Sequence, residues 1–217
     1  MAKAKKKNRE NIKKILDILE ETYPNAECEL NYTTPFELLI ATILSAQCTD
    51  VRVNKVTAEL FKKYNTAEEF AKLNTFEISE EIKSCGLYKS KAQKIKETSV
   101  LLCSNYGGKV PDNMEELTKL PGVGRKTANV VLSNAFGVDA IAVDTHVFRV
   151  SNRIGLVKTD TPEKTEFELM KVLPKKRWSK AHHLIIFHGR RICKARKPEC
   201  NICPLVEYCD YYKEGND

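Results

Sequence analysis

A helix begins directly after a tight turn in the sequence Leu120-Pro121-Gly122-Val123-Gly124-Arg125-Lys126-Thr127-Ala128. Pro121 fixes the backbone where it enters the turn, and Gly122 and Gly124 allow a sharp bend and the close approach of a partner. We expect the N–H groups of Val123, Gly124 and Arg125 to have no helical partners. Together with the helix dipole, they would form a site for an anion such as phosphate.

Lys126 lies in the first turn of this helix. The positive field at a helix N-terminus disfavours a protonated amine, so a free, nucleophilic amine becomes more accessible there. From this stretch alone, Lys126 is equally well interpreted as a further phosphate contact or a solvated cation. Asp144 follows at the predicted start of the next helix, where it either caps that helix or faces Lys126. An amine with a nearby carboxylate is the pair that an imine mechanism requires.

The composition is that of a globular chain. Its 217 residues, 42% of them hydrophobic and 30% charged, suffice for one large domain or two small ones. No apolar run approaches the roughly 20 residues that cross a membrane, and no apolar segment of a secretory signal follows the lysine-rich start, Met1–Lys14. We therefore expect an intracellular protein, cytoplasmic or associated with the nucleoid, that does not bind membranes.

The charge distribution predicts a polyanionic partner. The net charge is +7 and the pI is near 8.9. Ten Lys and Arg residues, and no Asp or Glu, occur between Lys171 and Lys197, and a second basic cluster occupies Lys3–Lys14. Charge runs are usually solvated faces, but a run of this length without carboxylates favours binding to nucleic-acid phosphate.

The eight cysteines form two groups. Four are scattered among apolar or helical neighbours and are predicted to be buried thiols without a further role: Cys28, Cys48, Cys85 and Cys103. The other four have the spacing C-x6-C-x2-C-x5-C and are predicted to hold a metal: Cys193, Cys200, Cys203 and Cys209. Four thiolates can hold a [4Fe-4S] cluster or a zinc ion. Since only one pair is closely spaced, the spacing favours the cluster, and the three histidines of 182–188 are interpreted as surface or core residues.

Helical periodicity and start signals predict an all-α chain with about ten helices, because no segment shows sustained strand alternation. The expected helices cover 8–23, 34–47, 51–64, 66–73, 75–85, 91–106, 112–120, 125–136, 144–153, 161–173 and 180–190. Ser90 is the expected cap of the helix over 91–106. The two helices on either side of the quoted turn form a helix-hairpin-helix unit over about 112–136.

In combination and in this order, the motifs resemble the endonuclease III family of DNA glycosylases, within the helix-hairpin-helix superfamily. The carriers are the quoted turn, the cysteine spacing, Val143-Asp144-Thr145-His146 and Ser45-Ala46-Gln47-Cys48-Thr49-Asp50. The resemblance covers roughly Ile12–Cys209 and implies two helical lobes with a DNA-binding cleft between them. One lobe is expected over 29–139, and the other over 1–28 plus 140–217, ending in a [4Fe-4S] cluster loop over 193–209.

The resemblance also implies the roles of single residues. Lys126 matches the family's nucleophile and Asp144 its catalytic carboxylate, while Gln47 and Leu87 match the loops that fill the duplex where the damaged base leaves. At position 48 many relatives have alanine instead of cysteine. The full set of expected DNA contacts is Gln47, Leu87, Gly122, Val123, Gly124, Arg125, Thr145, His146, Lys194, Arg196 and Lys197.

The implied activity is that of a monomeric base-excision-repair glycosylase with AP lyase activity. Its substrate would be double-stranded DNA that contains oxidised pyrimidines or abasic sites. Two related alternatives, adenine-mismatch and thymine-mismatch glycosylases, are disfavoured by Lys126. The adenine-mismatch enzyme also carries an extra C-terminal domain, whereas this sequence ends eight residues after Cys209. A third alternative is a non-catalytic helix-hairpin-helix protein that only grips phosphate.

Overall fold

The computed structural model describes residues 7–215, and every regular element within that range is a helix. The prediction of an all-α fold is confirmed. The chain divides into two compact units, one formed by Cys28–Val138 and the other by Met1–Glu27 together with Asp139–Asp217. No helix in the described part is long and apolar enough to span a bilayer.

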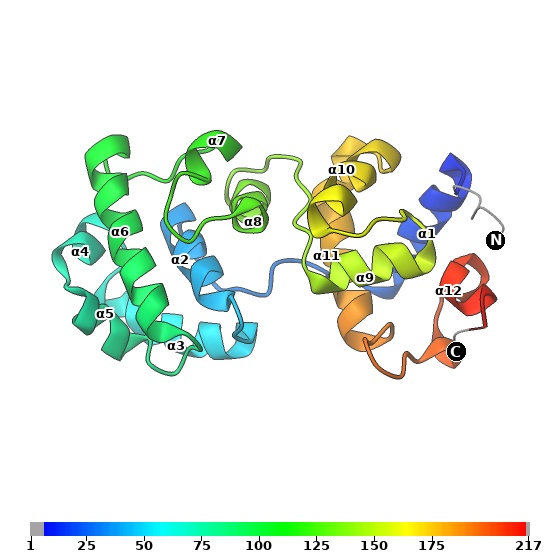
Figure 1. Ribbon diagram of the computed structural model, residues 1–217, viewed down its shortest axis with the longest axis horizontal. Coiled ribbons are helices and arrows are strands. Elements are labelled where there is room, and N and C mark those ends of the chain that lie inside the picture. The colour runs from blue at the N-terminus through cyan, green and yellow to red at the C-terminus, as the bar shows by residue number, and fades with distance from the viewer. Residues whose placement is uncertain (1–6, 216–217) are drawn as a thin grey trace. The chain divides into compact units, whose positions relative to one another are not determined.

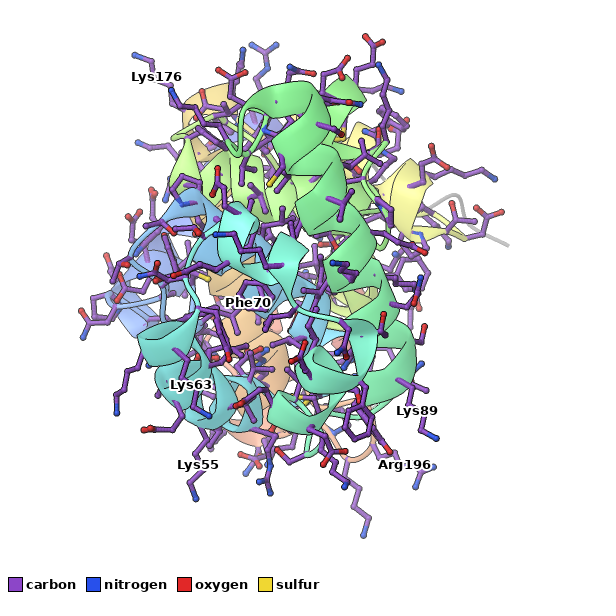
Figure 2. All side chains as sticks on the ribbon, turned by 90° about the vertical axis from the view of Figure 1, so that its left-hand side faces the viewer. Lys55, Lys63, Phe70, Lys89, Lys176 and Arg196 are labelled. Carbon is purple, nitrogen blue, oxygen red and sulfur yellow. The ribbon has the colours of Figure 1, made fainter. Side chains whose placement is uncertain are left out.

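The unit Cys28–Val138 is built around α2, whose residues are buried on nearly all sides. Its helices are α2 (Pro35–Ser45), α3 (Asp50–Lys63), α4 (Ala67–Lys72), α5 (Thr75–Glu81), α6 (Tyr88–Tyr106), α7 (Met114–Leu117) and α8 (Arg125–Ala135). Helix α2 packs against α3, α6 and α8, and α6 lies beside α4 and α5 (Figure 1). Figure 2 shows Phe70 inside this unit, whereas Lys63 and Lys89 point outward.

Side-chain caps set most helix starts in this unit, as the sequence predicts. Thr34 accepts a hydrogen bond from the amide of Glu37, and Thr66 forms a reciprocal capping box with Glu69. The helix expected over 75–85 ends earlier, at Glu81, because the chain then turns and the amide of Cys85 donates to the carbonyl of Ile82 at 2.8 Å.

The start of α6 corrects the prediction that Ser90 is its cap. Helix α6 begins at Tyr88, preceded by Leu87 in the left-handed conformation (φ 59°), and Ser90 lies within its first turn. The amide of Lys91 donates to the carbonyl of Leu87, and its ammonium donates to the carbonyl of Leu44 at 2.8 Å. These tertiary contacts hold the entry to α6, so the local cap signal at Ser90 is overridden.

The second unit has its core between α1, α9 and α11, which include the fully buried Ile15, Leu16, Val147, Leu184 and Ile185. Its elements are α1 (Arg9–Thr22), α9 (Thr145–Ile154), α10 (Pro162–Val172), η1 (Lys175–Arg177), α11 (Trp178–Arg191), η2 (Cys200–Ile202), η3 (Val206–Tyr208) and α12 (Asp210–Lys213).

Helix α11 begins two residues before the expected start, at Trp178. The indole of Trp178 is buried, and its Nε1–H donates to the carbonyl of Leu173. Burying this large side chain draws the chain into the helix earlier than the polar sequence predicts.

Much of the basic run Lys171–Lys197 is used inside this unit. The guanidinium of Arg177 pairs with Asp17 and Glu20 of α1, and the ammonium of Lys180 donates to two backbone carbonyls that follow α1. Arg191 stacks over two aromatic rings. The interpretation of the whole run as a phosphate-binding face is therefore too broad, since these three cations hold α1 and its exit against α11.

Candidate functional site

The hairpin between α7 and α8 is held against α6. Gly122 has φ +81°, and a Cβ atom there would lie 3.0 Å from Cδ of Lys94. The hydroxyl of Thr98, also on α6, donates to the carbonyl of Pro121 at 2.8 Å. The turn therefore needs glycine for its backbone conformation and is fixed by hydrogen bonding to a neighbouring helix.

The start of α8 is open to an anion. Gly124 is its N-cap, and no side chain among the described residues caps its first turn. A helix start without a side-chain cap leaves backbone amides available to an external acceptor. The amide of Val123 has no helical partner, as expected, but it donates within the turn to the carbonyl of Leu120 at 3.1 Å and is therefore not available to an anion. The anion site is thus narrower than predicted and begins at Gly124.

Lys126 stands in the first turn of α8, and its side chain is exposed. Within residues 7–215, its ammonium has no ion-pair or hydrogen-bond partner. By comparison, Lys119 at the other end of the hairpin is paired with Glu116 at 2.6 Å. An amine that is accessible and unpaired, beside an anion site, is chemically suited to attack an electrophilic carbon next to a phosphate.

Gln47 and Leu87 lie on two loops that touch each other. A Cβ atom on Gly86 would be 3.0 Å from the carbonyl oxygen of Gln47, so the loops meet backbone to backbone. Both residues have left-handed backbones, with φ 53° for Gln47 and 59° for Leu87, and both side chains are exposed. Leu87 leaves 57% of its surface open to solvent. The structure therefore brings together the two loops whose exposed side chains are predicted to enter the duplex.

Asp144 is the N-cap of α9, and its Oδ1 accepts a hydrogen bond from the amide of Val147 at 2.8 Å. Thr145 is exposed in the first turn, and His146 beside it is half-buried. Burial lowers the pKa of His146, and the Asp144 carboxylate only partly opposes this effect, so the ring is neutral at neutral pH. Lys126 belongs to the other unit, and the role of Asp144 toward it stays a prediction.

The four C-terminal cysteines line one cavity, together with residues of α9 and α11 such as Arg153 and His188. No three His, Cys, Asp or Glu side chains in the described part converge closely enough to hold a single metal ion. Polar side chains approach the thiols from α9 and α11: Nη1 of Arg153 donates to Sγ of Cys193 at 3.7 Å, and Nε2 of His188 lies 3.6 Å from Sγ of Cys203. Thiolate ligands with donors aimed at their sulfur atoms fit an iron–sulfur cluster.

Arg153 and His188 are not among the site residues predicted from the sequence. Arg149 and Arg153 are one turn apart on α9, and that spacing is the signal that could have identified them as a pair. Nη2 of Arg149 donates to the carbonyls of Gly189 and Cys193. His188, interpreted as a surface or core residue, is buried as expected, and its Nδ1 lies 3.1 Å from the hydroxyl of Tyr23. Burial lowers the pKa of His188 to about 4.

The loop after Cys193 is fixed by the same helix. Arg153 donates to the carbonyls of Lys194 and Ala195 at 2.7 and 3.0 Å. The ammonium of Lys194 pairs with Glu199, which reduces its charge toward a phosphate. Lys197 has a left-handed backbone (φ 51°), and Arg196 points outward (Figure 2). Arg196 and Lys197 are exposed, so this rigid loop presents two cations to solvent.

Comparison with known proteins identifies the family in which these features occur together. Residues 40–175 match the family model of the HhH-GPD superfamily base excision DNA repair proteins, and residues 193–209 match the iron–sulfur binding domain of endonuclease III. The chain is 53% identical to the endonuclease III of Rickettsia conorii, over 93% of this chain and 96% of that protein. It is 51% identical to the endonuclease III of Bacillus subtilis, over 92% and 93%.

The chain belongs to the endonuclease III family. A solved structure of a trapped endonuclease III–DNA covalent intermediate superposes with a TM-score of 0.92 at 49% identity, covering 97% of this chain and all of that one. A thermostable thymine-DNA glycosylase is similar at a TM-score of 0.83 and 28% identity, covering 94% and 98%. Membership of the endonuclease III family makes the protein a DNA-binding base-excision glycosylase and AP lyase with a [4Fe-4S] cofactor.

One other prediction concerns the four scattered cysteines. Of the four scattered cysteines, only Cys85 is fully buried. The other three are partly exposed: Cys28, Cys48 and Cys103. The prediction of four buried thiols is therefore wrong for these three: Cys28 and Cys48 lie in segments between helices, and Cys103 lies on a partly exposed position of α6.

Proposed function

We propose that this enzyme removes oxidised pyrimidines from double-stranded DNA and cleaves abasic sites through an imine formed on Lys126. The observation that carries this proposal is the exposed, unpaired amine of Lys126 in the first turn of α8, directly after the uncapped glycine turn. The trapped covalent intermediate described for a structural relative supports it. Relatives at about half identity support an endonuclease III activity over a thymine-mismatch activity, for which the similar structure is only 28% identical.

The start of α8 would bind the DNA backbone, and Lys126 and Asp144 would carry out the chemistry. The open amides at the start of α8 would bind a backbone phosphate, which places Lys126 beside the sugar of the target nucleotide. The neutral amine of Lys126 attacks the anomeric carbon, and the base leaves with the bonding electrons and takes a proton from water. Asp144 stabilises the cationic sugar and accepts a proton from the attacking amine. That proton passes to the ring oxygen as the sugar opens to the protonated imine. Loss of a proton from the neighbouring carbon then eliminates the 3′ phosphate.

The two adjoining loops would supply the means to reach the base. An oxidised pyrimidine stacks poorly, so it is cheaper to extrude than an intact base. Leu87 would enter the stack as an apolar wedge, and Gln47 would occupy the gap beside it. The left-handed backbones of both residues support this assignment, since such conformations cost free energy and cluster at binding sites.

The four cysteines would hold the [4Fe-4S] cluster, which in this position supplies a rigid cross-link between the end of α11 and the C-terminal segment. Arg196 and Lys197 on the loop after Cys193 would then contact phosphates. We also propose that the enzyme acts as a monomer inside the cell, in association with the nucleoid.

Borohydride trapping tests the proposal. The wild-type protein should form a reduced covalent complex with duplexes that contain an oxidised pyrimidine or an abasic site. Lys126→Ala should abolish the complex while the duplex still binds. Lys119→Ala is the matched control, because Lys119 is exposed on the same hairpin but is paired with Glu116. Absence of trapping by the wild-type protein, or undiminished trapping by Lys126→Ala, contradicts the imine assignment.

A second variant separates the two roles of Asp144. Asn is as good an N-cap as Asp, so Asp144→Asn keeps the hydrogen bond from Val147 and removes only the charge. We expect normal stability with a base-excision rate lower by about 10²-fold or more. An unchanged rate would leave Asp144 as a helix cap alone.

A further inference from the structure

A cysteine stands beside each of the two residues that are proposed to enter the duplex. Cys48 follows Gln47 directly, and Cys85 precedes Leu87 by two positions. Each cysteine is held by a local turn: the amide of Cys48 donates to the carbonyl of Ser45, and the amide of Cys85 donates to that of Ile82. The two cysteines therefore have fixed backbones on two loops that already touch.

The two side chains lie on the parts of these loops that are in contact. Gly86, next to Cys85, packs against the carbonyl of Gln47, next to Cys48, and the Cys48 thiol is close enough to the Cys85 thiol to help raise its pKa. Cys48 is partly exposed, whereas Cys85 is 1% exposed. A small reagent in solution therefore has access to one thiol of the pair, and the second thiol lies within reach of the first.

Two cations lie near the pair. The Lys91 ammonium and the Arg52 guanidinium both act on the Cys85 thiol and favour its thiolate, although burial outweighs them and raises the pKa of Cys85 to about 11. Lys91 is itself buried, and its ammonium donates to the carbonyl of Leu44 at 2.8 Å. Cations beside a thiol assist thiolate formation, which disulfide exchange requires.

We propose that Cys48 and Cys85 form a dithiol site that a low-molecular-weight disulfide converts into an intramolecular disulfide, which locks the loops of Gln47 and Leu87. The Cys48 thiolate attacks one sulfur of the reagent and expels one equivalent of its thiol, forming a mixed disulfide. Cys85 then loses its proton and attacks Sγ of Cys48, and the second equivalent of reagent thiol leaves. The two protein thiols are oxidised and the reagent disulfide is reduced to two thiols.

The cross-link changes the geometry of both loops. A disulfide bond of about 2 Å is shorter than any non-bonded contact between two sulfur atoms, so the loops must draw together when it forms. Gln47 and Leu87 are one and two residues from the bonded cysteines and move with them. Misplacement by about 1 Å can cost on the order of 10²-fold in rate. The consequence for DNA rests on the proposed function, whereas formation of the bond does not.

The experiment uses the full chain with its cluster, treated with oxidised glutathione while the cluster's visible absorbance is followed. Peptide mapping should find the peptides of Cys48 and Cys85 joined, with loss of two hydrogen atoms. In Cys85→Ala, Cys48 should retain the mixed disulfide, and in Cys48→Ala neither form should appear at these positions. Cys103→Ser, which removes another partly exposed thiol, should behave like the wild type. Wild-type protein without the cross-link overturns the proposal.

A second readout tests the lock. Nicking of an abasic-site duplex should fall about tenfold or more on oxidation, with the cluster absorbance unchanged, and should return after reduction with dithiothreitol. Cys48→Ala, which cannot form the cross-link, should nick normally under both conditions. If the cross-linked protein nicks as fast as the dithiothreitol-treated protein, the proposed lock is overturned. If the reduced wild type does not nick at all, the proposed function fails, and the peptide map still decides whether the disulfide forms.

Discussion

Leu87 offers a direct test of the link between backbone strain and function. A left-handed backbone costs a residue with a Cβ atom about 1–2 kcal/mol, and glycine avoids this cost. Glycine also loses about 0.5–1 kcal/mol more conformational entropy on folding than alanine. The difference predicts that Leu87→Gly is more stable than Leu87→Ala by about 0.5–1 kcal/mol. At an ordinary helix position the order is reversed, and glycine is less stable than alanine by about 1 kcal/mol.

Comparing two variants at one site removes the uncertainty in the leucine side chain itself, because both lack its partly buried methyl groups. Val100 provides the matched control, since it is 44% exposed in the middle of α6 and has a helical backbone. There, Val100→Gly should be less stable than Val100→Ala. Urea unfolding followed by helical circular dichroism, with the cluster intact, measures both differences through the shift in midpoint.

The same variants report on the wedge. Leu87→Ala and Leu87→Gly should lose base excision on duplex DNA by similar factors, because neither has an apolar side chain to insert. Both should still form the borohydride-trapped complex with a single-stranded abasic site, which needs no gap to be filled. If Leu87→Ala proves as stable as Leu87→Gly, the strain argument is wrong. If both variants excise bases from duplex DNA at the wild-type rate, the wedge assignment is wrong.

Other perturbations test the turn, the titrating groups and the two cross-links. Gly122→Ala should lower the free energy of unfolding by about 1–2 kcal/mol, because φ +81° is unfavourable for alanine, and urea unfolding measures this loss. Burial lowers the pKa of His183 to about 4. Since the unfolded chain protonates near 6.5, stability should be unaffected above that pH and fall by about 3 kcal/mol between about pH 6.5 and 4. His183→Gln should remove this part of the fall, as urea midpoints at both pH values would show. The proposed disulfide encloses a loop of about 38 residues and should raise the free energy of unfolding by up to about 4 kcal/mol. Removal of iron by a chelator should increase amide hydrogen exchange over 193–209 and spare the unit Cys28–Val138.

The helix-hairpin-helix and most helix starts were predictable because their signals are local. A threonine cap such as Thr34 or Thr66 satisfies amides three residues away, and a glycine with φ above zero marks the turn. The start of α6 was not predictable in this way. Ser90 carries a cap signal, but the contact between Gly86 and Gln47 and the hydrogen bond from Lys91 to Leu44 override it.

The internal contacts of the basic run could not be predicted from local sequence either. The sequence between Lys171 and Lys197 contains no carboxylate side chain. Arg177 nevertheless forms ion pairs with Asp17 and Glu20 on α1, more than 150 residues earlier in the chain. Long-range pairing of this kind depends on the packing of α1 against α11, which no window of sequence contains. For the cysteines the spacing predicts the ligands, whereas the donors Arg153 and His188 become visible only when α9 and α11 are folded around them.

In the described part of the chain, three residues other than glycine have a left-handed backbone: Gln47, Leu87 and Lys197. All three are predicted to contact DNA. Each is exposed, so its side chain gains little from the fold that strains its backbone. The surroundings hold the strain in place: adjoining loops fix Gln47 and Leu87, and cysteines and Arg153 hold the loop of Lys197. A residue kept in a costly conformation by its neighbours, with its side chain directed to solvent, is stabilised for recognition rather than for folding. Substitutions at these positions should therefore separate the two properties, with DNA processing lost where stability is kept or gained.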